Sequence, residues 1–274
     1  MKKINRRSFL AAAGLTAAAL ALTACGGSAS STASSTASSA AVSTSAAAEL
    51  TTVEAGKLTM ATNATFPPYE MTTDSGEIEG IDVDTAKAIA EKLGLELQID
   101  DMDFDAALLS VQQGKADIVM AGVTVTDERK AVMDFSDSYA TGIQSIIVPE
   151  GSDITSPDDL AGKKIGTQRG TTGYIYCSDD FGDDAVVAYD DGLTAVQALN
   201  NGQVDAVVID NAPAKEYVAA NPGLVILDTS YAEEDYAIGM AKGSALEDAV
   251  NAALEELKAD GTLQSIVDKY ITAE

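Results

Sequence analysis

The chain alternates between short runs of apolar residues and longer stretches in which apolar residues return every three or four positions. These runs predict strands at 58–62, 118–121, 164–167 and 205–209, the alternation of Leu95, Leu97 and Ile99 predicts one at 95–99, and the periodic stretches predict helices between them. A last strand is expected at 236–240, followed by a long helix with one buried face. Regular alternation of strands and helices is typical of an α/β fold.

Capping residues set the expected helix limits. Asp82 is predicted to cap a helix that Gly94 ends, and a second helix from Phe104 is expected to stop at Gly114. The segment 156–158, Ser-Pro-Asp, predicts another helix start, because proline suits the first helical position. A further helix is expected at 193–200.

One junction occurs twice. The helix end, glycine, aspartate and strand of 111–119 return at 199–207, and Gly-Lys followed by a strand occurs at both 56–57 and 162–163. These echoes suggest two similarly built α/β units. The alternative is that helix–glycine–strand junctions resemble one another anyway. The roughly 225 residues beyond the N-terminal segments fit one large or two modest domains.

The N-terminus has the pattern of an exported protein. Residues 1–24 read as a signal peptide, with basic residues before an apolar run, and 25–50 are a Ser/Ala/Thr-rich tether. Leu22-Thr-Ala-Cys-Gly26 resembles a lipobox, which implies that Cys25 is lipid-modified. Residues 5–10 resemble a twin-arginine motif, but an ordinary secretory signal explains them equally well.

Charge and composition exclude several classes of function. The formal net charge is −26, and without the four basic residues of the signal it is −30, which disfavours nucleic acid and anionic lipid surfaces as partners. The chain has no histidine, so Cys177, the cysteine left after Cys25, is expected to be a packing residue. The acidic run 100–105 lacks the glycine and closing carboxylate of a calcium loop. No metal or cofactor is expected.

One stretch combines a buried strand with an unusual cation. The run 118–121 leads into Thr126, a helix N-cap, and Arg129 then lies in the first helical turn. A cation there opposes the helix dipole, so an anion is expected to favour it. A guanidinium offers two parallel donors to a carboxylate.

The motif around this arginine resembles that of a known family. The string Ala121-Gly-x-Thr-x-Thr-x-Glu-Arg129, closing on Asp-Phe-Ser at 134–136, is similar to the signature of the polar amino acid-binding family of extracytoplasmic solute-binding proteins of ABC transporters. The resemblance covers nearly all of 56–272. It implies an α/β, two-lobe, type II periplasmic-binding-protein-like fold that closes at a hinge, each lobe being a mixed sheet flanked by helices. Lobe 1 would be 56–143 plus 236–274, and lobe 2 would be 144–235.

The resemblance also implies a set of ligand contacts, carried over position by position. Arg129 would hold the carboxylate of a free amino acid together with Thr171 and Thr172, and Asp210 would pair with the α-ammonium, although a strand-end aspartate is commonly only a helix cap. Phe66 and Phe104 would enclose the ligand's side chain. The whole implied set is Asn63, Phe66, Phe104, Ala121, Gly122, Thr124, Arg129, Gln168, Thr171, Thr172 and Asp210. Tyr69 is assigned to packing.

The side-chain amides of Asn63 and Gln168 indicate which ligand side chain the site prefers. Asn63 stands where basic-ligand relatives carry an aspartate, and Gln168 stands where the second lobe can reach the ligand's side chain. Neutral amides favour a neutral polar amino acid over a basic one, because no matched position supplies a buried counter-charge. Glu70 could supply one if it turns inward.

The expected function is therefore amino acid capture for transport. The protein would be a monomeric lipoprotein on the outer face of the cell membrane, bound there through Cys25, that passes its ligand to an ABC permease. Two alternatives remain open at this point. One is an enzyme on the same fold, such as a cyclohexadienyl dehydratase, and the other is a sensor domain with an external signalling partner.

Overall fold

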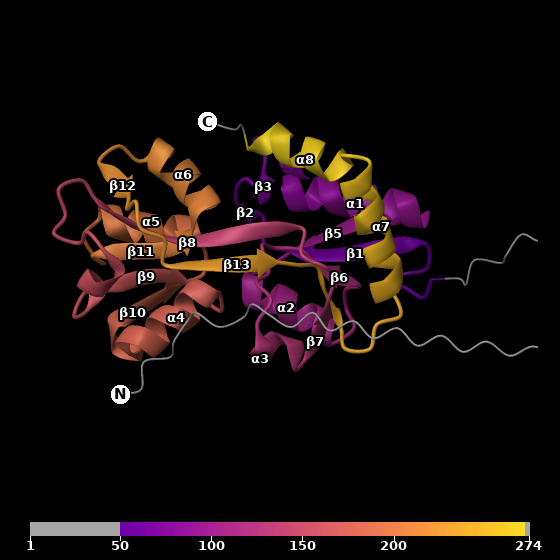
Figure 1. Cartoon of the computed structure of the whole chain (residues 1–274), viewed down its shortest axis with the longest axis horizontal. Coiled ribbons are helices and arrows are strands. Elements are labelled where there is room, and N and C mark those ends of the chain that lie inside the picture. Colours follow the sequence, from indigo (N-terminus) through magenta and orange to yellow (C-terminus); the bar gives the residue numbers. More distant parts are fainter. Residues whose placement is uncertain (1–49, 272–274) are drawn as a thin grey trace, which may run out of the picture. The chain divides into compact units, whose positions relative to one another are not determined.

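The computed structural model describes residues 50–271, which contain two main β-sheets (Figure 1). The expected signal peptide, the lipidation site at Cys25 and nearly all of the tether lie outside the described residues. No helix in the described part of the chain is long and apolar enough to cross a membrane.

The first sheet has the strand order β5-β1-β6-β14-β7. Its strands are β1 (Lys57–Thr62), β5 (Glu96–Asp101), β6 (Ile118–Val119), β7 (Met133–Phe135) and β14 (Gly239–Ala241). β1 runs parallel to both β5 and β6, whereas β14 is antiparallel to β6 and β7. The sheet is therefore mixed, and its last part comes from the far end of the sequence.

Helices cover this sheet on both faces (Figure 1). On one face α1 (Ile81–Leu93) packs against α7 (Glu247–Ala259) and α8 (Thr262–Tyr270), and on the other lies α2 (Phe104–Gln112). Val250, Ala253 and Leu257 form the buried face expected for the C-terminal helix, which is α7. The central strands β1 and β6 are almost fully buried because both faces of the sheet are covered, whereas the edge strand β5 carries polar residues and is only partly buried.

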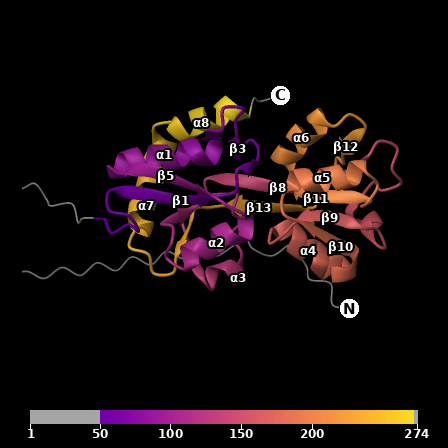
Figure 2. The same ribbon diagram turned by 180° about the vertical axis from the view of Figure 1, so that it is seen from behind.

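The second sheet has the order β10-β9-β11-β8-β12, with β13 also pairing with β8. Its strands are β8 (Ala140–Pro149), β9 (Ile165–Gln168), β10 (Val186–Tyr189), β11 (Ala206–Asp210), β12 (Leu224–Ile226) and β13 (Ala232–Tyr236). It is flanked by α4 (Thr172–Phe181), α5 (Gly192–Asn200) and α6 (Asn211–Ala220), as the view from behind in Figure 2 also shows.

The chain passes between the two sheets twice. It leaves β7 of the first sheet for β8 of the second, and it returns from β13 to β14. β8 and β13 are antiparallel neighbours, with Tyr236 opposite Ala140, so the two crossings lie side by side (Figure 1). A small third sheet, β2 (Thr65–Phe66), β3 (Glu70–Thr72) and β4 (Ile78–Glu79), lies in the segment after β1.

The repeated junction has the same backbone in both copies. Gly114 follows α2 with φ 65° and Gly202 follows α5 with φ 66°, and each is followed by an aspartate and a buried strand. A left-handed residue of this kind ends a helix at little cost only when it is glycine. Both junctions therefore end the helix in the same way, with a left-handed glycine, in agreement with the similarity of their sequences.

Three local predictions were wrong. Asp82 does not cap α1, whose N-cap is Gly80; it lies inside the first turn, buried, and accepts a 3.0 Å hydrogen bond from the Gly122 N–H. The Ser-Pro-Asp start produces only a 3-10 turn, Pro157–Leu160. The strand expected at 236–240 is divided, because β13 ends at Tyr236 in the second sheet and β14 begins at Gly239 in the first.

Candidate ligand-binding site

A pocket of about 430 Å³, including the part open to solvent, lies among residues from both main sheets. All eleven ligand-contact residues expected from the sequence line it: Asn63, Phe66, Phe104, Ala121, Gly122, Thr124, Arg129, Gln168, Thr171, Thr172 and Asp210. The structure thus brings together segments as far apart as 63 and 210, because the carboxyl ends of their strands face one another.

Arg129 is held in place by its own loop. Thr126 caps the short helix α3 (Asp127–Lys130), and its hydroxyl accepts from the Arg129 backbone N–H. The guanidinium is 8% exposed and donates to the carbonyl oxygen of Thr124 at 2.7 Å and to that of Gly170 at 3.2 Å. Its carbon lies 5.5 Å from the centre of the Phe104 ring. Burial lowers the pKa of Arg129 below its usual value, while the charge of Glu234 raises it.

The opposite wall is the start of α4. Thr171 is its N-cap and accepts from the Tyr174 N–H. The first N–H groups of a helix have no intrahelical acceptors, and in α4 these groups begin at Thr172. Thr172 is buried and lines the pocket. N–H groups in this position favour an anion, so the wall facing Arg129 suits the same kind of ligand group.

Asp210 has both of the roles considered for it. It caps α6 by accepting from the Ala212 N–H at 2.9 Å, and it also lines the pocket. Its second oxygen, Oδ2, accepts from the Ile143 N–H at 2.8 Å and from the Tyr236 hydroxyl at 3.0 Å. Burial raises the pKa of Asp210 to about 6, against the lowering effect of these donors.

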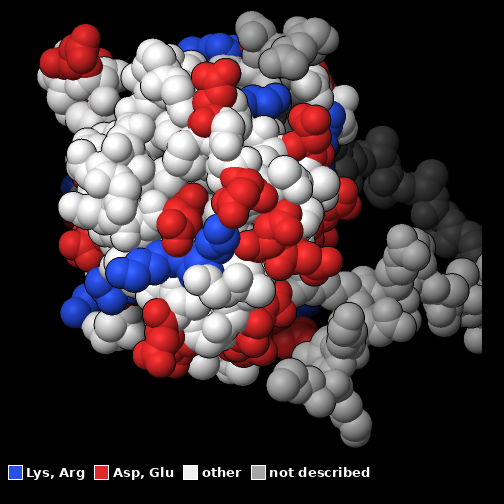
Figure 3. All heavy atoms as spheres, turned by 90° about the vertical axis from the view of Figure 1, so that its left-hand side faces the viewer, with Lys and Arg blue, Asp and Glu red and all other residues white. Residues whose placement is uncertain are grey.

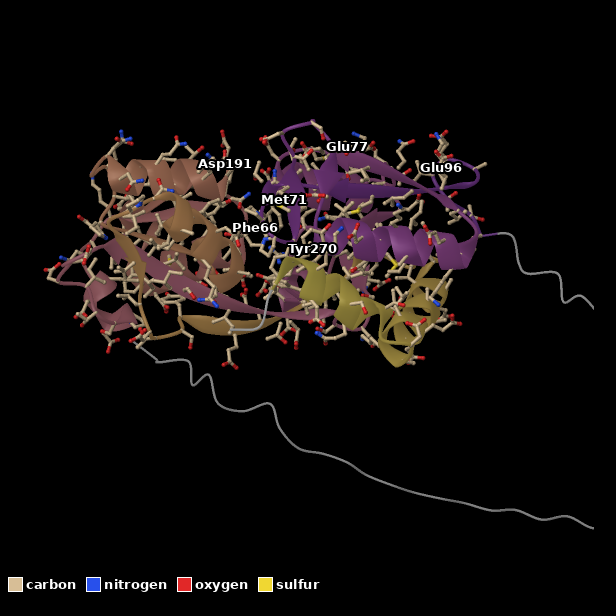
Figure 4. The ribbon with its side chains drawn as sticks, turned by 90° about the horizontal axis from the view of Figure 1, so that it is seen from above. Phe66, Met71, Glu77, Glu96, Asp191 and Tyr270 are labelled. Atoms are coloured by element: carbon tan, nitrogen blue, oxygen red, sulfur yellow. The ribbon has the colours of Figure 1, made fainter. Side chains whose placement is uncertain are left out.

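Aromatic rings form one side of the pocket. Phe66 lies where the first and second sheets meet (Figure 4), stacked on Tyr69, which packs edge-on against Tyr236. Gly122 sits beside these rings with φ 55°, and a Cβ there would lie 2.8 Å from the Phe66 ring. Only glycine fits this approach. Tyr69 is buried and does not line the pocket, in agreement with the packing role expected for it.

Five further residues line the pocket and were not predicted as contacts: Glu70, Gln144, Val208, Ile209 and Tyr236. Glu70 is completely buried, and its carboxyl lies beside that of Asp82. Burial, followed by the charge of Asp82, a side-chain hydrogen bond with Asp82 and the charge of Asp101, raises the pKa of Glu70 well above its usual range. Gln144 lies on β8 next to Ser145, and no sequence signal separates it from the other polar residues of this strand.

Other candidate chemistry is weak in the described part of the chain. It contains no group of three or more Cys, Asp or Glu residues that could hold a metal ion. Cys177 is buried, and burial raises the pKa of its thiol to about 12, which suits a packing residue. On the face seen in Figure 3, acidic side chains are spread among uncharged ones and lie on either side of a short band of Lys and Arg. This dispersed charge does not form a single acidic site.

Comparisons with known proteins identify the family of the chain. Residues 58–273 match the family described as bacterial extracellular solute-binding proteins, family 3. A Neisseria gonorrhoeae protein named as a probable histidine-binding protein is 34% identical over 99% of this chain and 98% of its own length.

Solved structures extend the likeness to the fold. An ancestral arginine-binding protein bound to glutamine has a TM-score of 0.76 and 43% identity, covering 80% of this chain and 99% of its own. Another, bound to arginine, has a TM-score of 0.75 and 44% identity, covering 79% of this chain and 98% of its own. These matches confirm the type II two-lobe α/β fold expected from the sequence.

Proposed function

Because the chain belongs to the bacterial extracellular solute-binding proteins of family 3, we propose that it captures a free polar amino acid in the pocket between its sheets and delivers it to an ABC permease. Its relatives are named for the amino acids they bind, including histidine and arginine. Binding rather than catalysis is therefore the function that the likeness supports best.

One observation carries the proposal. The pocket contains one buried cation, Arg129 on α3, and a buried carboxyl, Asp210 at the end of β11 in the second sheet. A free amino acid carries a carboxylate and an ammonium on the same carbon, so its charges complement such a pair. Arg129 and the start of α4 at Thr172 would take the carboxylate, and Asp210 would take the ammonium.

The two lobes are proposed to close on the ligand, because each lobe contributes part of the ligand contacts. We assign 56–143 plus 236–274 to lobe 1 and 144–235 to lobe 2, with the neighbouring crossings at β8 and β13 as the hinge. Arg129 lies in lobe 1 and Asp210 in lobe 2, so the ligand's two charges are satisfied together only when the lobes close. Binding then favours the closed arrangement by its differential contacts.

The ligand's side chain is assigned to a neutral polar class. Asn63 and Gln168 are buried amides that hydrogen-bond to each other at 2.8 Å, and they bring no formal charge to that part of the pocket. The raised pKa of Glu70 favours its neutral form, so it does not act as a ready counter-charge.

A basic amino acid is the second candidate, and Glu70 is the observation that favours it. Its carboxyl lines the pocket beside the buried carboxyl of Asp82, and a bound cation would favour its ionised form. The ancestral arginine-binding structures bound to glutamine and to arginine indicate that this scaffold accommodates either class.

The protein is further proposed to act as a monomeric lipoprotein held at the outer face of the membrane. The support is the lipobox-like sequence ending at Cys25 and the Ser/Ala/Thr-rich segment after it, which would tether the binding unit. Mass spectrometry of the protein purified from its membrane would detect the lipid on the peptide that begins at Cys25. An unmodified cysteine there would contradict this part of the proposal.

Binding is tested by a thermal-shift screen over the twenty amino acids, cystine and ornithine, followed by calorimetry. Arg129→Met should weaken the best ligand by at least about 100-fold, because it removes a buried partner of the carboxylate. Arg169→Met is the matched control, since Arg169 is an exposed arginine that pairs with Asp190. Tight binding by Arg129→Met would contradict the assignment, and conversion of a ligand, seen by mass spectrometry, would favour the dehydratase-like alternative.

A further inference from the structure

Glu234 is a buried acid just behind the pocket wall. It lies on β13 between Glu233 and Asp235, which are exposed, whereas Glu234 is 6% exposed. Its Oε1 has no hydrogen-bond partner among the described residues. A buried carboxylate is costly unless it is hydrogen-bonded, so Glu234 needs donors from the residues around it.

Three side chains donate hydrogen bonds to Glu234, and all three bonds end on one oxygen, Oε2. The hydroxyls of Thr124 and Thr172 and the side-chain amide of Gln144 each donate to it at 3.0 Å. The three donors line the pocket, whereas Glu234 does not. Thr124 follows β6 of the first sheet and Thr172 begins α4 beside the second, so this single oxygen connects both sides of the site.

These bonds determine whether the hydroxyls of Thr124 and Thr172 can donate to a ligand or only accept from it. A hydroxyl has one proton, and an ionised carboxylate only accepts. While Thr124 and Thr172 donate to Glu234, their hydroxyls can present only lone pairs to the pocket. They can then accept from an ammonium, but they cannot donate to a carboxylate.

The ammonium needs such acceptors. It carries three hydrogens, and Asp210 already accepts from the Ala212 N–H, the Ile143 N–H and the Tyr236 hydroxyl. A carboxylate has about four lone-pair sites, so Asp210 has roughly one left. Further acceptors have to come from neighbouring groups.

We propose that Glu234 is a positioning residue that turns the Thr124 and Thr172 hydroxyls into acceptors for the ligand's α-ammonium. The α-carboxylate is left to Arg129 and to the backbone N–H groups at the start of α4. This inference rests on the proposed binding of a free amino acid. It makes the site selective for α-amino acids over carboxylic acids of the same shape.

The test compares amino acids with their deaminated counterparts. Calorimetry would give the Kd of L-glutamine and glutaramic acid, and of L-arginine and guanidinopentanoic acid. The readout is the preference ratio, the Kd of the deaminated acid divided by that of the amino acid. In Glu234→Ala the freed hydroxyls can donate to a carboxylate, so the ratio should fall by at least about tenfold.

Two further variants separate positioning from folding. Glu234→Gln keeps the shape and an oxygen acceptor, so it should recover part of the lost ratio. Glu233→Ala, an exposed glutamate on the same strand, should leave the ratio unchanged. Any change in thermal unfolding of Glu234→Ala without ligand would report its structural cost separately from the ratio.

The outcomes are distinguishable. A ratio in Glu234→Ala equal to that of the wild type, or an equal fall in Glu233→Ala, would overturn the inference and leave the proposed function intact. If the wild-type chain bound none of the amino acids in the thermal-shift screen, the proposed function would fail, and the inference with it.

Discussion

The side-chain amide of Gln168 donates a 2.8 Å hydrogen bond to Oδ1 of Asn63, although the two residues are 105 positions apart and follow strands of different sheets. Each amide is also fixed locally. Asn63 donates to the Met102 carbonyl at 2.9 Å, and Gln168 donates to the Asp190 carbonyl at 3.3 Å. The part of the pocket proposed to meet the ligand's side chain is thus an ordered pair of neutral groups.

Asn63→Asp should shift the preference of the site toward basic ligands. The change places a carboxylate where Gln168 now donates, and a buried carboxylate favours a nearby cation. We expect the ratio of the affinities for L-arginine and L-glutamine to rise by about tenfold or more, measured by calorimetry. Losing the bond to the Met102 carbonyl should also cost about 1–3 kcal/mol of stability.

Asn200→Asp is the control for this change, because Asn200 is exposed and bonds only to Asn221 in the described structure. It should leave the affinity ratio unchanged. If Asn63→Asp also left the ratio unchanged, Asn63 would not contact the ligand's side chain, and the basis for a neutral preference would be lost.

The sequence predicted the residues that line the pocket better than the buried residues behind them. The positions of Asn63, Arg129 and Asp210 follow from motifs that lie at strand ends, and strand ends in α/β proteins meet at one edge. Their gathering in one pocket could therefore be expected without coordinates. What each residue contacts in the ligand stays a prediction.

The buried acids could not be assigned in advance. Asp82 looked like a helix cap because it is an aspartate before an apolar helix, but Gly80 begins the helix, and a Cβ at Gly80 would lie 2.2 Å from the Tyr69 carbonyl oxygen. Glu234 sits in a run of acids that a sequence reading treats as solvated. Only pairing with β8, which fixes the face to which each side chain points, separates Glu234 from its exposed neighbours.

Gly142→Ala should destabilise the crossing strands. A Cβ at Gly142 would lie 2.4 Å from the Tyr236 ring, which is completely enclosed. Forcing a methyl group into such a contact typically costs about 1–3 kcal/mol, which urea denaturation would measure. Thr141→Ala, at the exposed neighbouring position, should change stability by less than about 0.5 kcal/mol. Equal stability of Gly142→Ala and wild type would mean that Tyr236 is free to move.

Asp82→Asn should flatten the dependence of stability on pH. Burial raises the pKa of Asp82 from 3.8 to about 6. Between these values the unfolded chain loses this proton while the folded chain keeps it, so stability falls as pH rises from about 4 to 6. An asparagine oxygen can still accept from the Gly122 N–H without this penalty, which is up to about 3 kcal/mol at neutral pH.

Urea denaturation at several pH values between 4 and 8 would measure this effect. Glu70 has its pKa raised in the same direction, so a decline with pH should remain in Asp82→Asn but be smaller than in the wild type. Asp74→Asn, at an exposed aspartate, should show the full wild-type decline. A variant Asp82→Asn that declined as steeply as wild type would show that Asp82 is ionised alike in both states.

Tyr236→Phe should weaken ligand binding, and more so in mild acid. The Tyr236 hydroxyl donates to Oδ2 of Asp210 at 3.0 Å and lowers the pKa of that carboxyl, which burial otherwise raises to about 6. Without the hydroxyl the pKa rises further, so a larger fraction of Asp210 is protonated at pH 6 and cannot pair with an ammonium. We expect a loss of about tenfold at pH 8 and a clearly larger one at pH 6, measured by calorimetry at both. Tyr270→Phe is the control, because the Tyr270 hydroxyl donates to Asp84 on α1, and this variant should bind as the wild type does at both pH values. If Tyr236→Phe lost the same affinity at pH 6 and at pH 8, Tyr236 would act by packing rather than through Asp210.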